Sequence, residues 1–402
     1  MSKIEKILDD LKEKDIIISL VDKELKIQAP KGFITPEIKN FLVENKKTII
    51  NFLAKKNNIK MDFSIFLFSD NVDDENDKYK LLLEVAKIAD ENNFSAIWTP
   101  ERHFHKLGGI YSNPAIISAA LSSITKNISL RAGSVVLPIN DVIRTAENWS
   151  IIDNLSKGRV ELSFATGWHI NDFVFEPENY QNRKEIMFDR IEEVKKLWEG
   201  EKLKRINGAN KEIEIEIHPK PYNKNLEIWV TAIGNPETYI KVGEKGYNLM
   251  TCLLDQDIEE LEKKLELYFQ ALEKNGHRKN KKIAVFMHSY FGESKEQVKN
   301  KVKEPFKKYL KSTLDLLGKF GNASDLTINP ENLTKNDKEE LLEFAFERYF
   351  ENRTFFGDKE ILEDKIAKLA KIGVTEIACL IDFGLDYEDI IASINKISYF
   401  TK

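Results

Sequence analysis

Cysteine is scarce in this chain, and its scarcity excludes several kinds of protein. The 402 residues contain two cysteines, Cys252 in the run MTCLL and Cys379 in the run IACLI. Two residues in apolar runs provide neither a disulfide framework nor a cysteine-rich metal site. We expect both to be buried free thiols in strands, which fits a reducing compartment.

Long apolar runs and an excess of basic charge are also absent. No stretch of 18 or more apolar residues occurs, and the N-terminus MSKIEKILDD has no apolar signal core. We therefore expect a cytoplasmic protein that does not interact with membranes. Lys and Arg number 61 against 66 Asp and Glu, a net charge of -5. Such a balance does not favour nucleic acid as a partner, because few surplus cations could neutralise phosphates.

The common nucleotide and nucleophile motifs are missing. The sequence has no G-x-G-x-x-G after a predicted strand, no G-x-x-x-x-G-K-[ST] and no G-x-S-x-G. These absences argue against a Rossmann site, a P-loop and a serine hydrolase. If the protein is a redox enzyme, its reducing equivalents would arrive already stored on a flavin.

Residues 1–57 read as a separate small unit. Helical spacing predicts a first helix, followed by two short β runs around an Asp22-Lys23 turn. A second helix is predicted from about Pro36, and residues 54–60 form the natural linker. The apolar residues that set the two helical faces are Ile4, Ile7, Leu8 and Leu11, then Ile38, Phe41, Leu42, Ile49, Ile50 and Leu53.

From Met61 onward, short apolar runs alternate with amphipathic segments, which indicates repeated βα units and a parallel sheet. Eight strands, each followed by a helix, favour a closed (β/α)8 TIM barrel over residues 61–402. The predicted strands are 61–67, 95–100, 128–137, 159–166, 227–233, 247–253, 282–291 and 375–382. The predicted helices are 77–92, 113–125, 141–155, 184–199, 236–244, 257–275, 294–312 and 385–398.

Two segments do not fit this alternation. Residues from about 313 to 358 are an insertion between the seventh and eighth strands, with no function that the sequence reveals. Residues 200–226 are a second excursion, with the β-like run IEIEIHPKPY inside it.

The strand ends are rich in polar and aromatic residues. Barrel enzymes place their sites at the C-terminal ends of the strands, where this chain has TPERHFH (99–105), AGSVVLP (132–138), ATGWHINDF (165–173) and AIGNPET (232–238). Three interpretations are open from the residues alone. The first is a metal site built from Glu101, His103, His105 and His169. The second is a polar mouth in which these histidines only form hydrogen bonds. The third is the lining of a bulky cofactor, with an apolar floor from Trp98, Phe104, Trp168 and Phe173.

The turn GNPET, residues 234–238, has the features of a helix start. Asparagine at the N-cap and proline at the first helical position favour a helix whose free N–H groups suit a phosphate. Arg183, at the head of the fourth predicted helix, could add a cation to the same phosphate. Most such turns bind nothing, so this turn alone does not establish a phosphate site.

Together, four motifs resemble bacterial luciferase-like monooxygenases, in particular the subgroup associated with nonribosomal peptide and polyketide assembly lines. The motifs span about residues 61–400 in order and are WTPERHFHKLGGIYSNP, RAGSVVLP, VIRTAENWSIIDNLSKGRVELSFATGWHINDF and GVTEIACLIDFGLDYEDIIASI. The resemblance implies reduced FMN bound at the barrel mouth and O2 as co-substrate, with no metal. It also implies a cis peptide bond at Gly133-Ser134.

The resemblance assigns roles to particular residues. Its phosphate pocket maps onto Gly234, Asn235, Thr238 and Arg183, and its catalytic imidazole falls in the E-x-H region. Luciferase itself has two consecutive histidines after the glutamate, where this chain has Arg102 and His103. It also has Cys-Arg where this chain has Ala165-Thr166, so light emission is not expected. The predicted catalytic residues are His103, His169 and Arg102, and the remaining flavin contacts are Glu101, Gly133, Ser134, Thr166 and Trp168.

The segment LVDKELKIQAPKGFITPEIKNFLVENKKTIINFL resembles the N-terminal docking domain of tubulysin-type synthetases. The resemblance implies that residues 1–57 capture a short tail of a partner by adding a strand to a sheet edge. Lys23, Lys26 and Lys31 would then attract an acidic tail. The alternative is an appendage that only aids solubility.

These observations predict an FMN-dependent monooxygenase that oxidises an aminoacyl or acyl group on a carrier protein. A separate flavin reductase would supply reduced FMN, a carrier protein or synthetase module would dock through residues 1–57, and we expect a homodimer. Carbon hydroxylation, nitrogen hydroxylation and Baeyer-Villiger insertion all remain open. The alternatives are a deazaflavin-dependent oxidoreductase and a non-catalytic flavin-binding or docking adaptor.

Overall fold

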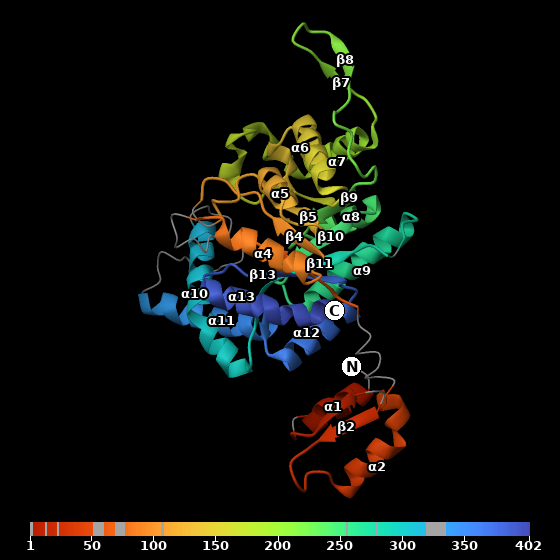
Figure 1. Cartoon of the computed structure of the whole chain (residues 1–402), viewed down its shortest axis with the longest axis vertical. Coiled ribbons are helices and arrows are strands. Elements are labelled where there is room, and N and C mark those ends of the chain that lie inside the picture. The colour runs from red at the N-terminus through yellow and green to blue at the C-terminus, as the bar shows by residue number, and fades with distance from the viewer. Residues whose placement is uncertain are drawn as a thin grey trace. The chain divides into compact units, whose positions relative to one another are not determined.

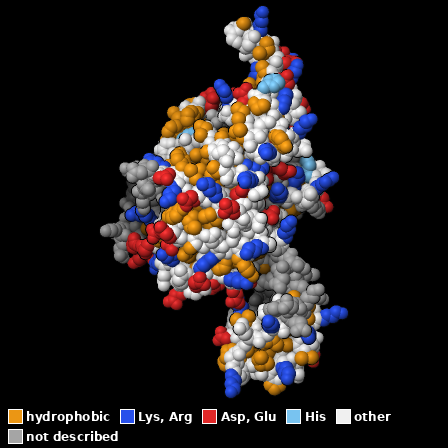
Figure 2. Space-filling model, viewed as in Figure 1, with side chains coloured by type: hydrophobic (Ala, Val, Ile, Leu, Met, Phe, Trp, Pro, Cys, Tyr) orange, Lys and Arg blue, Asp and Glu red, His pale blue; other side chains and the backbone are white. Residues whose placement is uncertain are grey.

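The chain divides into two units, Met1–Lys60 and Met61–Lys402. The computed structural model describes residues 3–12, 14–21, 24–50, 60–68, 77–105, 108–254, 256–278, 280–318 and 335–402. Basic and acidic side chains are interspersed over the visible face of both units (Figure 2). Among the described residues, no helix is both long and apolar enough to cross a membrane.

The N-terminal unit has the predicted order of helix, β-hairpin and helix. Helix α1 (Lys3–Lys12) precedes β1 (Ile17–Val21) and β2 (Glu24–Gln28), which pair antiparallel. Helix α2 (Pro36–Glu44) begins where Thr35 accepts a hydrogen bond from the Ile38 amide at 3.3 Å. The two helices and the hairpin share a small core, whose buried members are Leu11, Ile16, Leu42 and Ile49.

The second helix is shorter than predicted. The side chain of Asn45 donates to the Phe41 carbonyl at 3.0 Å, and the helix ends there before helical turns resume at residues 46–50. An asparagine that binds the backbone competes with a continuous helix. The Asp22-Lys23 turn, Leu53 and residues 54–59 of the predicted linker lie outside the described residues.

The second unit is the predicted (β/α)8 barrel. Its eight parallel strands pair in chain order, and pairing of β10 with β11 closes the ring. The strands are β3 (Asp62–Phe66), β4 (Ala96–Thr99), β5 (Ser129–Val136), β6 (Val160–Ala165), β9 (Glu227–Thr231), β10 (Asn248–Cys252), β11 (Ile283–Phe291) and β13 (Glu376–Leu380). Cys252 and Cys379 are buried free thiols in β10 and β13, as predicted.

Helices surround the barrel (Figure 1). Seven of these eight helices match the predicted segments. The exception is α10, which continues beyond residue 312, where the sequence predicted its end. These helices are α4 (Lys80–Glu91), α5 (Pro114–Ser122), α6 (Val142–Ser156), α7 (Arg183–Glu199), α8 (Pro236–Lys245), α9 (Ile258–Lys274), α10 (Lys295–Gly318) and α13 (Tyr387–Ile397).

The excursion at residues 200–226 contains a β-hairpin that projects from the barrel (Figure 1). Its strands are β7 (Leu203–Ile206) and β8 (Glu212–Ile215), which pair antiparallel. Only the first part of IEIEIHPKPY is therefore a strand.

The insertion contains more regular structure than the sequence predicted. Helix α11 (Lys335–Asn352) packs on α10, with ion pairs such as Lys307 to Glu339 at 2.6 Å and Lys299 to Glu347 at 2.7 Å. The short strand β12 (Phe355–Gly357) pairs in parallel with the end of β11. Helix α12 (Lys359–Lys371), which precedes β13, was not predicted.

A buried arginine joins the barrel strands from inside. Arg131 on β5 donates to both oxygens of Glu376 on β13 at 2.7 and 2.8 Å, and its Nε lies 2.9 Å from Glu161 on β6. The guanidinium carbon lies 4.7 Å from the ring centroids of both Trp98 and Trp229. Burial opposes the charge of Arg131, but the two carboxylates outweigh burial and raise its pKa above the ordinary value.

Replacing this arginine should destabilise the barrel strongly. Arg131→Met leaves buried Glu376 without its cation and Glu161 with only the more distant Lys282 at 3.9 Å, so we expect the free energy of unfolding to fall by about 3–5 kcal/mol. Urea unfolding followed by tryptophan fluorescence measures the change. Arg144→Met, at an exposed position on α6, is the control and should change stability by less than about 0.5 kcal/mol.

A triple variant covers the case in which Arg131→Met does not fold. Adding Glu161→Gln and Glu376→Gln removes both orphaned charges, so the triple variant should be more stable than Arg131→Met alone. Equal urea midpoints for Arg131→Met and the unaltered protein would show that the ion pairs contribute no net stability.

Candidate active site

Two loops at the C-terminal ends of barrel strands carry half of the predicted site residues, including all three predicted catalytic ones. Residues 100–105 follow β4, and residues 166–175 follow β6. Because all eight strands are parallel, their C-terminal ends open on the same face of the barrel. The predicted residues of both motifs therefore gather at one mouth.

Glu101 ties two strand ends together at this mouth. Its carboxylate accepts hydrogen bonds from the Val136 amide at 2.7 Å and from the side chain of Asn140 at 2.9 and 3.1 Å. The same carboxylate lies 3.1 Å from Nε2 of His103. Glu101 thus fixes the loop after β4 to the end of β5, and it orients the predicted catalytic His103.

Arg102 is buried and lies against two aromatic rings. Its guanidinium carbon is 4.3 Å from the ring centroid of Phe68 and 4.9 Å from that of Trp168. Gly108 allows this arrangement, because a Cβ there would lie 2.8 Å from both Cδ of Arg102 and the Phe68 carbonyl oxygen. Arg102 therefore links the loops after β3, β4 and β6.

Large apolar side chains are exposed around this polar cluster. Phe104 is 61% exposed, Phe175 52% and Trp168 48%, and the Phe104 and Phe175 ring centroids lie 5.6 Å apart. The ring of His103 packs edge-on against Phe175 at 5.0 Å. Exposed aromatic rings beside buried charges suit a flat, partly apolar ligand such as an isoalloxazine.

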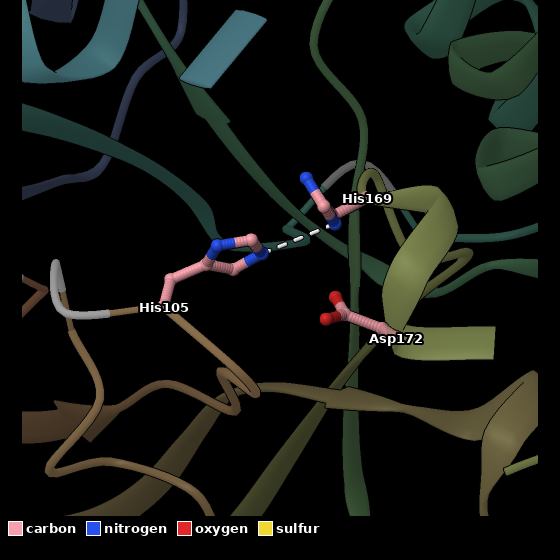
Figure 3. A group of neighbouring side chains, drawn as sticks. All are labelled: His105, His169 and Asp172. Atoms are coloured by element: carbon pink, nitrogen blue, oxygen red, sulfur yellow. Dashed lines mark hydrogen bonds between the residues drawn. The ribbon is translucent and has the colours of Figure 1, made fainter. Parts of the chain in front are cut away.

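His105, His169 and Asp172 meet at the same mouth (Figure 3). Nε2 of His105 lies 3.1 Å from Nδ1 of His169, and candidate ligand atoms of all three residues lie within 4.8 Å of one another. Burial, assisted by His105 and Arg102, lowers the pKa of His169 to about 4. Burial and Arg102 also lower the pKa of His105, so the site favours the neutral form of both rings.

Asp172 is buried and differs from an ordinary surface carboxylate. Its Oδ1 has no hydrogen-bond partner among the described residues. Burial raises the pKa of Asp172 to about 6, against the opposing effects of His103 and Arg102.

A metal ion would compete with existing bonds at this cluster. The Asn171 amide donates to Nδ1 of His169 at 3.2 Å, which caps the 3-10 helix η2 (Ile170–Val174). A metal ligand needs a free lone pair, but the lone pair on Nδ1 of His169 already accepts a hydrogen bond from the backbone. Of the predicted metal ligands, Glu101 and His103 bind each other in a separate pair.

Gly133 and Ser134 lie inside the barrel at the end of β5. The peptide bond between them is cis, as the resemblance implied. The hydroxyl of Ser134 lies 2.8 Å from that of Ser163 and 2.6 Å from that of Thr231. A Cβ on Gly133 would lie 3.0 Å from both Phe66 and Trp98. The Gly133 backbone is therefore packed closely against these two side chains of the barrel interior.

The predicted phosphate turn has an open approach. Asn235 is the N-cap of α8, and its side-chain oxygen accepts from the Glu237 amide at 2.9 Å. A Cβ on Gly234 would meet no described heavy atom within 4 Å. Arg183, at the start of α7, donates to the Tyr180 carbonyl at 2.8 Å. Lys184 at the start of α7 lies 3.2 Å from Glu237 at the start of α8, so the two helix starts are close together.

Sequence reasoning missed part of this site. Asp172 and Phe175 were not among the predicted residues, and His105 was considered as a metal ligand or a hydrogen-bonding group but was not assigned a place in the active site. Three further residues lie after strand ends, where the sequence placed them, and these are Thr166, Gly234 and Asn235. Thr166 is half-buried, and Gly234 and Asn235 are exposed. The spacing of Asp172, three residues after His169 in GWHIND, was the available signal.

Neutralising Asp172 should change how stability depends on pH. Its pKa rises from 3.8 to about 6 on folding, so burial of the carboxylate costs little stability below about pH 4, increasingly more between pH 4 and 6, and a constant amount above that. We expect Asp172→Asn to be more stable than the unaltered protein by about 3 kcal/mol at pH 8, relative to their difference at pH 4. Unfolding midpoints measured from pH 4 to 8 give this curve.

Asp189→Asn, at an exposed position on α7, is the matched control and should give a flat difference. A flat difference for Asp172→Asn as well would mean that the Asp172 carboxylate is not penalised by burial.

Comparisons with known proteins agree with this arrangement. Residues 61–376 match the luciferase-like monooxygenase family, and residues 4–55 match the TubC N-terminal docking domain. The oxygenase component of the flavin-dependent trigonelline monooxygenase of Acinetobacter baylyi is 26% identical over 84% of this chain and 93% of its own length. The alkanal monooxygenase alpha chain of the Kryptophanaron alfredi symbiont is 26% identical over 51% of this chain and 57% of its own length.

Solved structures show the same fold. A monooxygenase of Streptomyces bottropensis has a TM-score of 0.69 at 19% identity and covers 85% of this chain and 98% of its own. The oxygenating constituent of 3,6-diketocamphane monooxygenase of Pseudomonas putida, in complex with FMN, has a TM-score of 0.67 at 17% identity, with the same coverage. An F420-dependent secondary alcohol dehydrogenase has a TM-score of 0.59 at 16% identity and covers 83% of this chain and 99% of its own.

The family match spans well over half of the chain, and the predicted strand-end motifs lie at one barrel mouth. This chain therefore belongs to the luciferase-like monooxygenase family of flavin-dependent enzymes, and its N-terminal unit is similar to the TubC N-terminal docking domain.

Proposed function

We propose that this enzyme uses reduced FMN and O2 to oxidise an aminoacyl or acyl group carried on an assembly-line protein. A separate flavin reductase supplies the reduced FMN. The observation that carries this proposal is the presence, on one chain, of a luciferase-like barrel and a TubC-type docking domain. A docking domain brings the barrel to a protein partner, which a free metabolite would not require.

The turn at residues 234–238 supports FMN as the flavin. Asn235 uses its side-chain oxygen to cap α8, so it would offer its Nδ2 amide to a phosphate. Thr238 adds a hydroxyl, and the guanidinium of Arg183 adds a cation held in place by the Tyr180 ring at 4.4 Å. A phosphate at the start of α8 would also be favoured by the helix dipole.

When bound, the reduced flavin supplies the electrons with which O2 is split between product and water. The protein's own residues prepare the site for that reaction. Phe104, Trp168 and Phe175 provide apolar surface that a bound flavin and acyl group would cover, and this excludes water from the reacting atoms. Arg102 supplies a fixed positive charge, and His103, held by Glu101, and His169 supply imidazoles within the same mouth.

The N-terminal unit has surface features that suit an extended acidic tail. Within the described residues, β1 and β2 pair only with each other, so their outer edges remain available for main-chain pairing. Ile17, Ile27 and Phe33 expose apolar surface beside them. Lys26 and Lys31 are exposed and would attract acidic residues, whereas Lys23 lies outside the described residues.

A homodimer is also part of the proposal. Ile116 on α5, with Ile151 and Leu155 on α6, expose large apolar side chains. A second copy of the chain covering these helices would remove that surface from water.

Removing the phosphate cation should weaken FMN binding selectively. Because a charge-assisted bond to phosphate contributes about 1.5–3 kcal/mol, we expect Arg183→Ala to raise the Kd of FMN about tenfold or more. Riboflavin, which lacks the phosphate, should bind Arg183→Ala and the unaltered protein equally. Lys195→Ala, at an exposed position on the same helix, is the control. Tighter binding of coenzyme F420 than of FMN would contradict the choice of flavin.

The docking unit should determine how efficiently a carrier-bound substrate is oxidised. With NADH, a flavin reductase and acylated carrier protein, we expect a mass gain of one oxygen atom on the acyl group. Lys26→Glu with Lys31→Glu should reduce the initial rate about tenfold by repelling the acidic tail. Lys46→Glu with Lys47→Glu, at exposed positions of the same unit, makes the same charge change as a control. No mass gain on any cognate carrier protein would refute the proposed substrate class.

A further inference from the structure

The hydrogen bonds of His169 determine where its proton lies. A backbone amide is always a donor, and the Asn171 amide points at Nδ1 of His169 from 3.2 Å. Nδ1 must therefore carry a lone pair, which leaves the proton of the neutral ring on Nε2.

The same atom fixes the role of His105. Nε2 of His105 lies 3.1 Å from Nδ1 of His169. Since Nδ1 is an acceptor, Nε2 of His105 must be the donor. Two N–H groups, one from the backbone and one from His105, thus converge on a single lone pair and hold the His169 ring in one orientation.

On balance the surroundings oppose a charged His169, because burial, His105 and Arg102 lower its pKa to about 4, although an ionised Asp172 nearby would favour the charge. The charged and titratable groups near it are His105 and Arg102 from the loop after β4 and Asp172 from η2, with Glu101 and His103 beside Asp172. Protonating Nδ1 would break both converging bonds and would place a cation in buried surroundings near Arg102. The other ring nitrogen of His169, Nε2, points away from Asp172 and from the His105 bond (Figure 3).

We propose that His105 is a positioning residue, which holds His169 as a neutral imidazole whose Nε2–H acts as a hydrogen-bond donor rather than as a base. The role of this hydrogen-bond donor in catalysis rests on the proposed function. The position of the proton on His169, in contrast, can be measured in the protein without flavin or substrate. A ring held in this way can stabilise negative charge that develops on an oxygen atom, as neutral histidines do in other enzymes.

Three substitutions at His105 separate this role from simple packing. His105→Gln keeps a donor at about the position of Nε2, His105→Leu removes the bond, and His105→Glu replaces the donor with an acceptor. His105→Glu should therefore draw a proton onto Nδ1 of His169 and raise its pKa. The matched control is His218→Gln, at an exposed position.

Nitrogen-15 NMR of histidine-labelled protein, with His169 assigned by His169→Gln, reads the tautomer without any flavin. We expect a proton on Nε2 and none on Nδ1 of His169 in the unaltered protein, in His105→Gln and in His218→Gln. His105→Glu should move the proton to Nδ1 or protonate both nitrogens. A proton on Nδ1 in the unaltered protein would overturn the proposal, as would stoichiometric Zn²⁺ binding that shifts the signals of both histidines.

Turnover provides the second measurement. His105→Glu should lower kcat about tenfold with a smaller change in KM, and His105→Gln should stay within about threefold, because one hydrogen bond is at stake. Equal losses in Gln and Glu variants would indicate packing and would overturn the positioning role. Absence of turnover in the unaltered protein would count against the proposed function, whereas the NMR result would still decide the tautomer.

Discussion

The ion-pair network around Arg131 is the constraint on which the barrel depends. Six side chains from six different strands meet in the barrel interior, and these are Ser64, Trp98, Arg131, Glu161, Trp229 and Glu376. A buried cation with two carboxylates tolerates little displacement, because any unpaired charge is expensive in a low dielectric. The network therefore fixes the stagger of the strands, and with it the positions at which their C-terminal ends open into loops.

The mouth is built on those fixed ends by carboxylates that accept from the backbone. Glu101, after β4, accepts from the Val136 amide at the end of β5, and Asp382, after β13, accepts at 3.0 Å from the Phe68 amide after β3. These bonds hold the loop that carries Arg102 and His103 and the loop that carries Phe68, on whose ring Arg102 lies. The polar part of the site is thus held firmly, whereas the aromatic part is left exposed to receive a ligand. Such a division suits an enzyme that must bind a flavin and a substrate before chemistry begins.

Most of the fold could be predicted from local patterns, and the failures have local causes. The buried parallel strands appear as apolar runs, as in MTCLL and IACLI, and the helices between them have amphipathic spacing. Helix α12 was missed because the long segment between the seventh and eighth strands was treated mainly as an insertion. The break at Asn45 was missed because helical periodicity continues on both sides of it. The strand β12 has only three residues, which is too few to show a period.

The sequence by itself determined the class of fold: a (β/α)8 barrel, polar and aromatic residues at its strand ends, and a small separate unit before it. These follow from the order and spacing of residues along the chain. The tertiary structure alone decided which side chains meet. His105 and His169 are 64 residues apart, and their pairing arises because β4 and β6 end on the same face of a closed ring. The proton positions at this pair depend on a single backbone amide, which no pattern of side chains along the chain specifies.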